Sequence, residues 1–170
     1  MPVIETTHDE EALTVTIVAE FAASPQRVWE IYADPRQLEA IWGPPTHPAT
    51  VVDHSLAPGG RVNYFMTGPE GDKYYGFWEV SEVEAPSRLV FRDYFGDEEF
   101  NALESMPGST NTYTFSGADE GTRVVYESKF DSVDGLRKVL EMGMDEGATL
   151  ATNQIDALLA RDCAALAGER

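Results

Sequence analysis

Apolar and polar residues alternate over residues 12–21 (ALTVTIVAEF), near the start of the chain. Successive side chains of a strand point to opposite faces, so this pattern predicts a strand with one buried face. Two short helices are expected next, because Ser24 and Asp34 are helix-capping residues and each precedes a proline suited to the first helical position. The segment 42–45 (WGPP) then ends the second helix.

Residues 48–130 continue as alternating segments separated by residues that form turns. The turns fall at 58–60, 68–72, 85–87 and 117–121. Connections of hairpin length leave no room for the crossovers that parallel strands need, so six antiparallel strands are expected here. A longer segment, 96–109, interrupts the series.

The last forty residues change to a helical period, which indicates one long helix or two helices separated near Gly143. Gly143 and Gly147 each lower helix stability by about 1 kcal/mol relative to alanine, so a compensating role is expected. Their spacing opens a trough on one helix face, which fits either close packing on the sheet or the wall of a ligand cavity. The whole pattern predicts an α+β fold in which a curved, seven-stranded antiparallel sheet surrounds a long C-terminal helix. A ligand cleft is common between such layers.

Four stretches carry a family resemblance. They are FAASPQRVWEIYADPRQLEAIWGP, DHSLAPGGRVNYFM, YYGFWEVSEVEAPSRLVF and LEMGMDEGATLATNQIDALLA. In this order they resemble the START-like, helix-grip (SRPBCC) superfamily and, within it, the family related to the activator of Hsp90 ATPase (AHSA1-like). The resemblance implies a single domain over 1–170, with a flexible segment at 1–10 and a core at 11–165. It also implies that Trp42 lies beside a cavity mouth, where it forms a plug or a lid of the cavity or simply packs under the turn.

Charge and composition exclude several functions. Thirty acidic and 12 basic residues give a net charge of −18, which repels nucleic acids and anionic membrane surfaces. The chain has no apolar run of membrane-spanning length. Its single cysteine, Cys163, excludes an internal disulfide. The first residues, MPVIETTHDE, do not resemble a signal peptide, and a cytoplasmic location is therefore expected.

The polar residues predict no catalytic or metal-binding group. His8, His47 and His54 lack the spacing of a metal site, and no phosphate-binding or nucleophile motif is present. The strand carboxylates Glu79, Asp93 and Glu127 are expected on the solvent side. No cofactor and no catalytic residue are therefore expected, and an enzymatic role is not favoured.

The aromatic residues give the main functional prediction, because many recur at alternate positions on consecutive strands. A cavity between the sheet and the C-terminal helix is expected to bind a small hydrophobic or aromatic molecule. The residues expected to line it are Trp42, Asn63, Tyr64, Met66, Tyr74, Trp78, Phe91, Phe95, Tyr113, Tyr126, Gly143 and Gly147. Entry is expected to be gated by Trp42 or by the segment 96–109.

Two other functions stay open at this point. Relatives in the superfamily include cyclases and hydrolase-like enzymes, so the same cavity is able to position an aromatic or polyketide substrate. The family name suggests a co-chaperone-like protein partner, which the single predicted domain supports only weakly. A homodimer formed through a sheet edge or a helix is compatible with the pattern.

Overall fold

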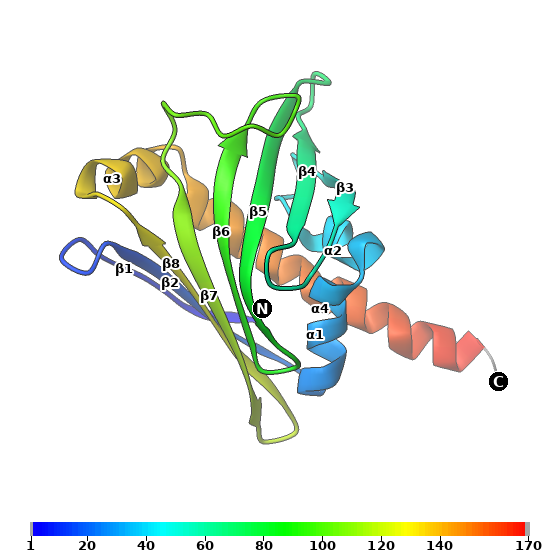
Figure 1. The fold of residues 1–170 in the computed structure, drawn as a ribbon. Helices are drawn as coiled ribbons and strands as arrows, with labels where there is room; N and C mark the ends of the chain where they lie inside the picture. The colour runs from blue at the N-terminus through cyan, green and yellow to red at the C-terminus, as the bar shows by residue number, and fades with distance from the viewer. Residues whose placement is uncertain (1, 169–170) are drawn as a thin grey trace.

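The computed structural model describes residues 2–168, with side chains up to residue 162, and the side chain of Cys163 lies outside this part. Eight strands form one antiparallel sheet (Figure 1). They are β1 (Val3–Asp9), β2 (Thr14–Phe21), β3 (Ala49–His54), β4 (Arg61–Thr67), β5 (Lys73–Glu84), β6 (Arg88–Gly96), β7 (Ser109–Ala118) and β8 (Gly121–Phe130). Their order in the sheet is β1-β2-β8-β7-β6-β5-β4-β3, so β3 to β8 form the expected meander and β2 pairs with its last strand.

The helices are α1 (Pro25–Ala33), α2 (Pro35–Ile41), α3 (Val133–Glu141) and α4 (Met144–Gly168). The expected caps begin the first two. The Ser24 side chain accepts a hydrogen bond from the backbone N–H of Arg27, and the Asp34 side chain accepts one from that of Arg36. Each of these helices has proline in its first turn, as the sequence predicts.

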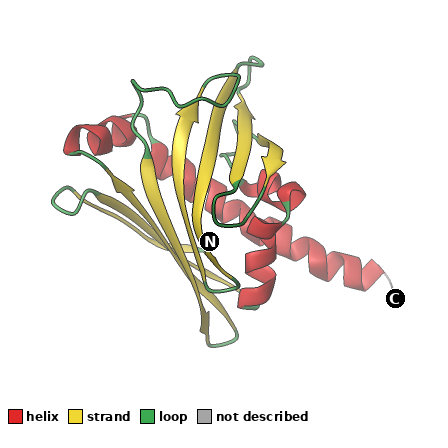
Figure 2. Cartoon of the chain, in the orientation of Figure 1, coloured by secondary structure: helices red, strands yellow, loops and turns green. Residues whose placement is uncertain are grey.

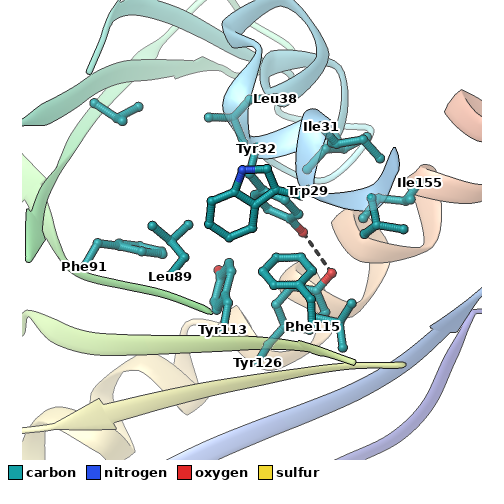
Figure 3. Close-up of a cluster of buried hydrophobic side chains, with 14 of the residues drawn as sticks. Trp29, Ile31, Tyr32, Leu38, Leu89, Phe91, Tyr113, Phe115, Tyr126 and Ile155 are labelled. Atoms are coloured by element: carbon teal, nitrogen blue, oxygen red, sulfur yellow. Dashed lines mark hydrogen bonds between the residues drawn. The ribbon is translucent and has the colours of Figure 1, made fainter. Parts of the chain in front are cut away.

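The helices gather on one side of the curved sheet, and α4 runs along that side (Figure 2). The sheet face turned toward them is called the inner face here. Tyr113 of β7 and Tyr126 of β8 lie on it, because both rings pack against Tyr32 of α1 (Figure 3). The Tyr32 and Tyr126 hydroxyls are joined by a 2.8 Å hydrogen bond within this core.

The resemblance predicts the helix-grip architecture correctly, but the sheet has eight strands rather than seven. The additional strand is β1, which lies in the segment expected to be flexible. It pairs with β2 along its length, and the backbone N–H of Val3 donates to the Asn153 side chain of α4. The ordered sheet therefore begins at Val3, not at residue 11.

The C-terminal segment forms two helices, α3 and α4, and not one long helix. Gly143 separates them with a φ of +76°, a left-handed conformation that glycine adopts without strain. Its N–H donates to the carbonyl oxygen of Leu140, which closes the end of α3. Gly143 thus serves the turn between α3 and α4.

Candidate functional site

A row of aromatic side chains crosses the inner face of the sheet. Trp78 of β5 stacks on Phe91 of β6, with ring centroids 3.9 Å apart. Phe91 meets the edge of Tyr113, and Tyr113 meets Tyr126 at 4.6 Å. Alternation on consecutive strands aligns these rings, as the sequence predicts. All four are buried, so they form a continuous aromatic surface from β5 to β8.

Trp42 extends this row from outside the sheet. It is the residue after α2, and its indole packs edge-on against Trp78 at 4.9 Å and Tyr64 at 5.8 Å. The chain turns sharply at Gly43, whose φ is +90° and where a Cβ atom would lie 2.4 Å from the carbonyl oxygen of His47. The Gly-Pro-Pro turn therefore places Trp42 against the inner face, where it packs under the turn.

A partly buried carboxylate lies beside the aromatic rings. The Tyr64 hydroxyl on β4 donates a 3.0 Å hydrogen bond to Oδ1 of Asp93 on β6. Burial raises the pKa of Asp93 to about 7, and hydrogen bonds from the Tyr64 hydroxyl and the Tyr94 backbone N–H oppose part of this shift. Burial and the charge of Asp93 raise the pKa of Tyr64 well above its ordinary value, so Tyr64 stays a neutral donor.

The Tyr64 side chain of β4 reaches Asp93 of β6 across β5, and this depends on a glycine in β5. Gly76 of β5 is the cross-strand partner of Tyr64. A Cβ atom at this position would lie 2.5 Å from the Tyr64 hydroxyl oxygen and 2.6 Å from Cζ. The missing side chain leaves room for the tyrosine ring to lie across β5.

Two buried indole N–H groups lack hydrogen-bond partners in the described part of the chain, and they belong to Trp42 and Trp78. Buried polar groups of native proteins are paired in the great majority of cases, with protein or with water. Neither N–H is exposed to solvent, so only a molecule that enters the aromatic surface can accept a hydrogen bond from either. The tryptophan edges supply donors, while Asp93 supplies an acceptor when it is ionised.

The other predicted lining residues are distributed unevenly. Met66 and Phe95 are partly exposed and share strand faces with Tyr64 and Phe91. Tyr74 lies at the end of the sheet with 55% of its surface exposed and contacts His47. Asn63 lies on the opposite face from Tyr64, where its amide donates to Asp53. The structure therefore does not bring Asn63 to the aromatic surface.

The two helix glycines have different surroundings. Gly143 is at the α3–α4 turn, with no other atom near its missing side chain. Gly147 faces the Gly-Pro-Pro turn, and the atom nearest to its missing side chain is Cγ of Pro44, at 4.0 Å. Gln154, two turns later on α4, donates a 2.7 Å hydrogen bond to the carbonyl oxygen of Gly43. The start of α4 and the Trp42 turn are thus held together.

Among the described residues, the main backbone contacts between the helices and the sheet involve β1, β2, β3, β7 and β8. Helix α4 lies closest to β1 and β2, α1 to β7 and β8, and α2 to β3. The inner face of β4 to β6, which carries Asp93, is therefore covered mainly by side chains and the Trp42 turn.

The segment 96–109 spans two surfaces. Its residue Phe100 packs against Tyr75 on the outer face of the sheet, with ring centroids 5.8 Å apart. Near its other end, the carbonyl oxygen of Ser105 accepts a hydrogen bond from the Lys138 side chain of α3. The segment joins the sheet end to α3, and its expected gating role stays a prediction.

Two surface hollows lie away from the aromatic surface. One, of about 650 Å³, is lined by polar residues of β1, β2 and their turn, including His8 and Glu10. The other, of about 460 Å³, lies over Gly60, Arg61 and Arg92. No group of three or more histidine, cysteine, aspartate or glutamate side chains suited to a metal ion occurs among residues 2–162. The titratable pair Asp93–Tyr64 is the clearest chemical feature of the inner face.

Sequence reasoning missed Asp93, although its signal was present. Asp93 lies two residues from both Phe91 and Phe95, which the alternation assigns to the inner face. Its immediate neighbours, Arg92 and Tyr94, instead lie on the outer face, where the guanidinium stands 5.3 Å from the ring centroid. The expectation that Asp93 is on the solvent side is therefore wrong. Glu79 and Glu127 are exposed, as expected.

Comparison with known proteins gives one family and a consistent fold. The model of the family described as "Activator of Hsp90 ATPase homolog 1-like protein" matches residues 22–160. The crystal structure of protein Ms6760 from Mycobacterium smegmatis is 58% identical, with a TM-score of 0.87, and the match covers 93% of this chain and 97% of that one. A solution structure from Arthrobacter aurescens is 43% identical, with a TM-score of 0.90 and coverage of 94% and 92%. No curated protein matches the chain.

Proposed function

This chain belongs to the AHSA1-like family, and from this premise we propose that it binds a small hydrophobic or aromatic molecule on the inner face of β4 to β6. Family membership supports the fold and leaves the ligand open, because one fold carries many unrelated sites. The proposed binding surface consists of Trp42, Tyr64, Trp78 and Phe91, with Met66 and Phe95 at its partly exposed side. The ligand would lie between this surface and the start of α4.

The observation that carries the proposal is the pair of unpartnered indole N–H groups within the aromatic surface. A purely structural core has no need for buried donors without acceptors, because each unpaired group lowers stability by about 1–3 kcal/mol. Ligand sites combine mostly apolar walls with a few polar groups that fix orientation. The aromatic rings and the two N–H groups have this composition.

An enzymatic role is a second candidate, favoured by the position of Asp93. A carboxyl group with a pKa of about 7, beside a tyrosine hydroxyl, is suited to general acid–base chemistry near neutral pH. Saturable turnover of an aromatic or polyketide substrate, lost in Tyr64→Phe, would support this role. Binding without turnover would leave the chain a binding protein.

Other roles have less support. A cytoplasmic location and a homodimer stay predictions, and no described helix is long and apolar enough to cross a membrane. A chaperone partner is suggested by the family description alone. It becomes the leading alternative if no small molecule binds.

Intrinsic fluorescence tests the proposed surface, because the chain has only three tryptophans. Trp42 and Trp78 belong to the surface, whereas Trp29 packs against Phe115 on the side of the core near α1. The protein is first purified from its own host, and native mass spectrometry identifies any bound molecule. That molecule, or a hit from a thermal-shift panel of aromatic compounds, is then titrated while emission is recorded.

We expect the ligand to change the emission of the wild-type chain and of Trp29→Phe, and to change that of Trp42→Phe much less. Trp29→Phe is the matched control, since it removes a buried tryptophan outside the surface. A response that disappears in Trp29→Phe and persists in Trp42→Phe would place the ligand elsewhere. An empty protein that gives no thermal shift with any compound would refute the proposal.

A further inference from the structure

We infer that Asp93 is the anchor of the proposed site, and that it selects aromatic ligands whose head group donates a hydrogen bond, a hydroxyl or a protonated amine. This inference rests on the proposed function, since it names the ligand class for the same surface. It is carried by the position of the carboxylate among the aromatic rings and by its incomplete set of partners.

Among the described residues, the carboxylate has one side-chain partner, Tyr64, whose hydroxyl donates to Oδ1. The backbone N–H of Tyr94 also donates to the carboxylate, and no cationic side chain does. Nearby charge does not compensate for this. Arg92, the residue before Asp93 in β6, lies on the outer face and forms an ion pair with Asp131.

Asp93 therefore differs from the carboxylates that pair with arginine. Glu10, Glu20, Glu82 and Asp162 each form an ion pair with an arginine near the surface. A buried carboxylate without a cationic partner is unfavourable, and a structural role would be served better by an apolar side chain. A hydrogen-bond donor from a ligand would supply the partner that the chain lacks.

The residues around Asp93 indicate which chemical class the body of the ligand belongs to. Trp78 is the cross-strand neighbour of Asp93, and Tyr64 and Trp42 continue the aromatic wall. Flat rings stack favourably on such surfaces, and the faces of tryptophan and tyrosine also attract cations. The net charge of −18 favours neutral and cationic molecules over anions. An aromatic body with a donor head group meets all of these conditions.

Three naphthalene probes of similar size test the head group. 2-Naphthol donates a hydrogen bond, 2-methoxynaphthalene only accepts one, and 2-naphthylmethylamine is a charged donor at neutral pH. Their dissociation constants are measured by calorimetry at pH 8 with the full chain. A hydrogen bond to a carboxylate contributes about 1.5–3 kcal/mol, so we expect the donors to bind roughly ten- to a hundredfold more tightly than the ether.

The variant Asp93→Asn keeps the shape of the side chain and the hydrogen bond from Tyr64. It places an amide N–H donor where the wild-type chain has the acceptor oxygen Oδ2. We expect it to remove the preference for 2-naphthol, because the amide N–H is able to donate to the oxygen of 2-naphthol and of 2-methoxynaphthalene alike. Glu127→Gln, an outer-face carboxylate on β8, is the matched control and should leave all three affinities unchanged. A donor preference that survives in Asp93→Asn would overturn the inference.

The pH profile gives an independent reading. The titratable groups that face Asp93 are Tyr64 on β4 and Tyr113 on β7, and burial raises the pKa of both hydroxyls, so they remain neutral from pH 5 to 8. The donors should bind more tightly as pH rises and Asp93 ionises, and Tyr64→Phe should move this transition to higher pH. A flat profile for both donors would contradict the inference.

The comparison of the two donor probes shows which head group the site prefers. Tighter binding of the amine indicates a cationic ligand, whereas tighter binding of 2-naphthol indicates a phenol or alcohol. Both results support Asp93 as the anchor. Equal binding of all three probes to the wild-type chain would overturn the inference and leave the proposed function standing. Failure of every probe to bind would refute both.

Discussion

Asp93 should make the stability of the fold depend on pH in a defined direction. Burial raises its pKa from 3.8 to about 7 in the folded chain. Between these values the folded state holds a proton that the unfolded state has released, so stability falls as pH rises through this window. Above pH 7 the full penalty is present. At 1.36 kcal/mol per pKa unit it amounts to about 4 kcal/mol.

The variant Asp93→Asn removes this penalty, because an amide has no charge to bury. The free energy of unfolding of the variant, minus that of the wild-type chain, should therefore increase by about 3 kcal/mol between pH 5 and pH 8. This change is large beside a typical domain stability of about 5–15 kcal/mol. The comparison of two pH values cancels any fixed effect of the amide itself.

Urea unfolding followed by tryptophan fluorescence measures the difference, and an unchanged m-value confirms that both chains unfold from comparable states. Glu127→Gln serves as the control, because this exposed carboxylate should give the same small difference at both pH values. If the Asp93→Asn difference is also independent of pH, the carboxyl is not desolvated in the folded chain. Asp93 would then have no electrostatic reason to favour a ligand that donates a hydrogen bond.

Three further substitutions test the local geometry by urea unfolding. Gly76→Ala places a methyl group 2.5 Å from the Tyr64 hydroxyl oxygen, so a loss of about 1–3 kcal/mol is expected, and no loss would show that the ring moves freely. Gly43→Ala introduces a side chain at a φ of +90° and should destabilise by more than about 1 kcal/mol, whereas a neutral result would refute the need for glycine in this turn. Tyr126→Phe leaves the buried Tyr32 hydroxyl unpaired and should lower stability by about 1–3 kcal/mol, and an unchanged midpoint would contradict the 2.8 Å bond.

The alternation of apolar residues was sufficient to predict the central strands. It gave β4 and β5 with the bounds that the structure shows, and it placed Trp78 and Phe91 on a shared face. Short turns between strands fixed their antiparallel pairing, because no other connection fits. Local signals were strong here because each strand has one face in the core.

Strand β1 was missed because its own residues give little reason for order. Nearly all of its positions are exposed, and even Ile4 has 53% of its surface exposed. The strand is held by backbone pairing with β2 and by contacts with α4, neither of which is encoded in the segment itself. Such an edge strand becomes visible only when its neighbours are known.

The candidate site was predicted in part, for a related reason. The aromatic rings follow from alternation, whereas Asp93 stands between two outer-face residues and its own face is indicated only by Phe91 and Phe95, two positions away. Even when Asp93 is assigned to the inner face, its raised pKa depends on burial by other segments of the chain, among them the Trp42 turn. A sequence pattern gives the face of a strand, and it does not give the extent to which that face is covered.

The burial of polar groups on the inner face connects the stability of this chain with its proposed function. Asp93 lowers the stability of the free protein above neutral pH, and the unpartnered N–H groups of Trp42 and Trp78 lower it further. Replacing these polar groups with apolar ones would give a more stable core, and functional sites commonly retain such unfavourable groups. A ligand that supplies a donor to Asp93 and an acceptor to the indoles would relieve these penalties together. Its binding free energy would then come largely from polar groups whose hydrogen-bonding capacity the folded chain leaves partly unused.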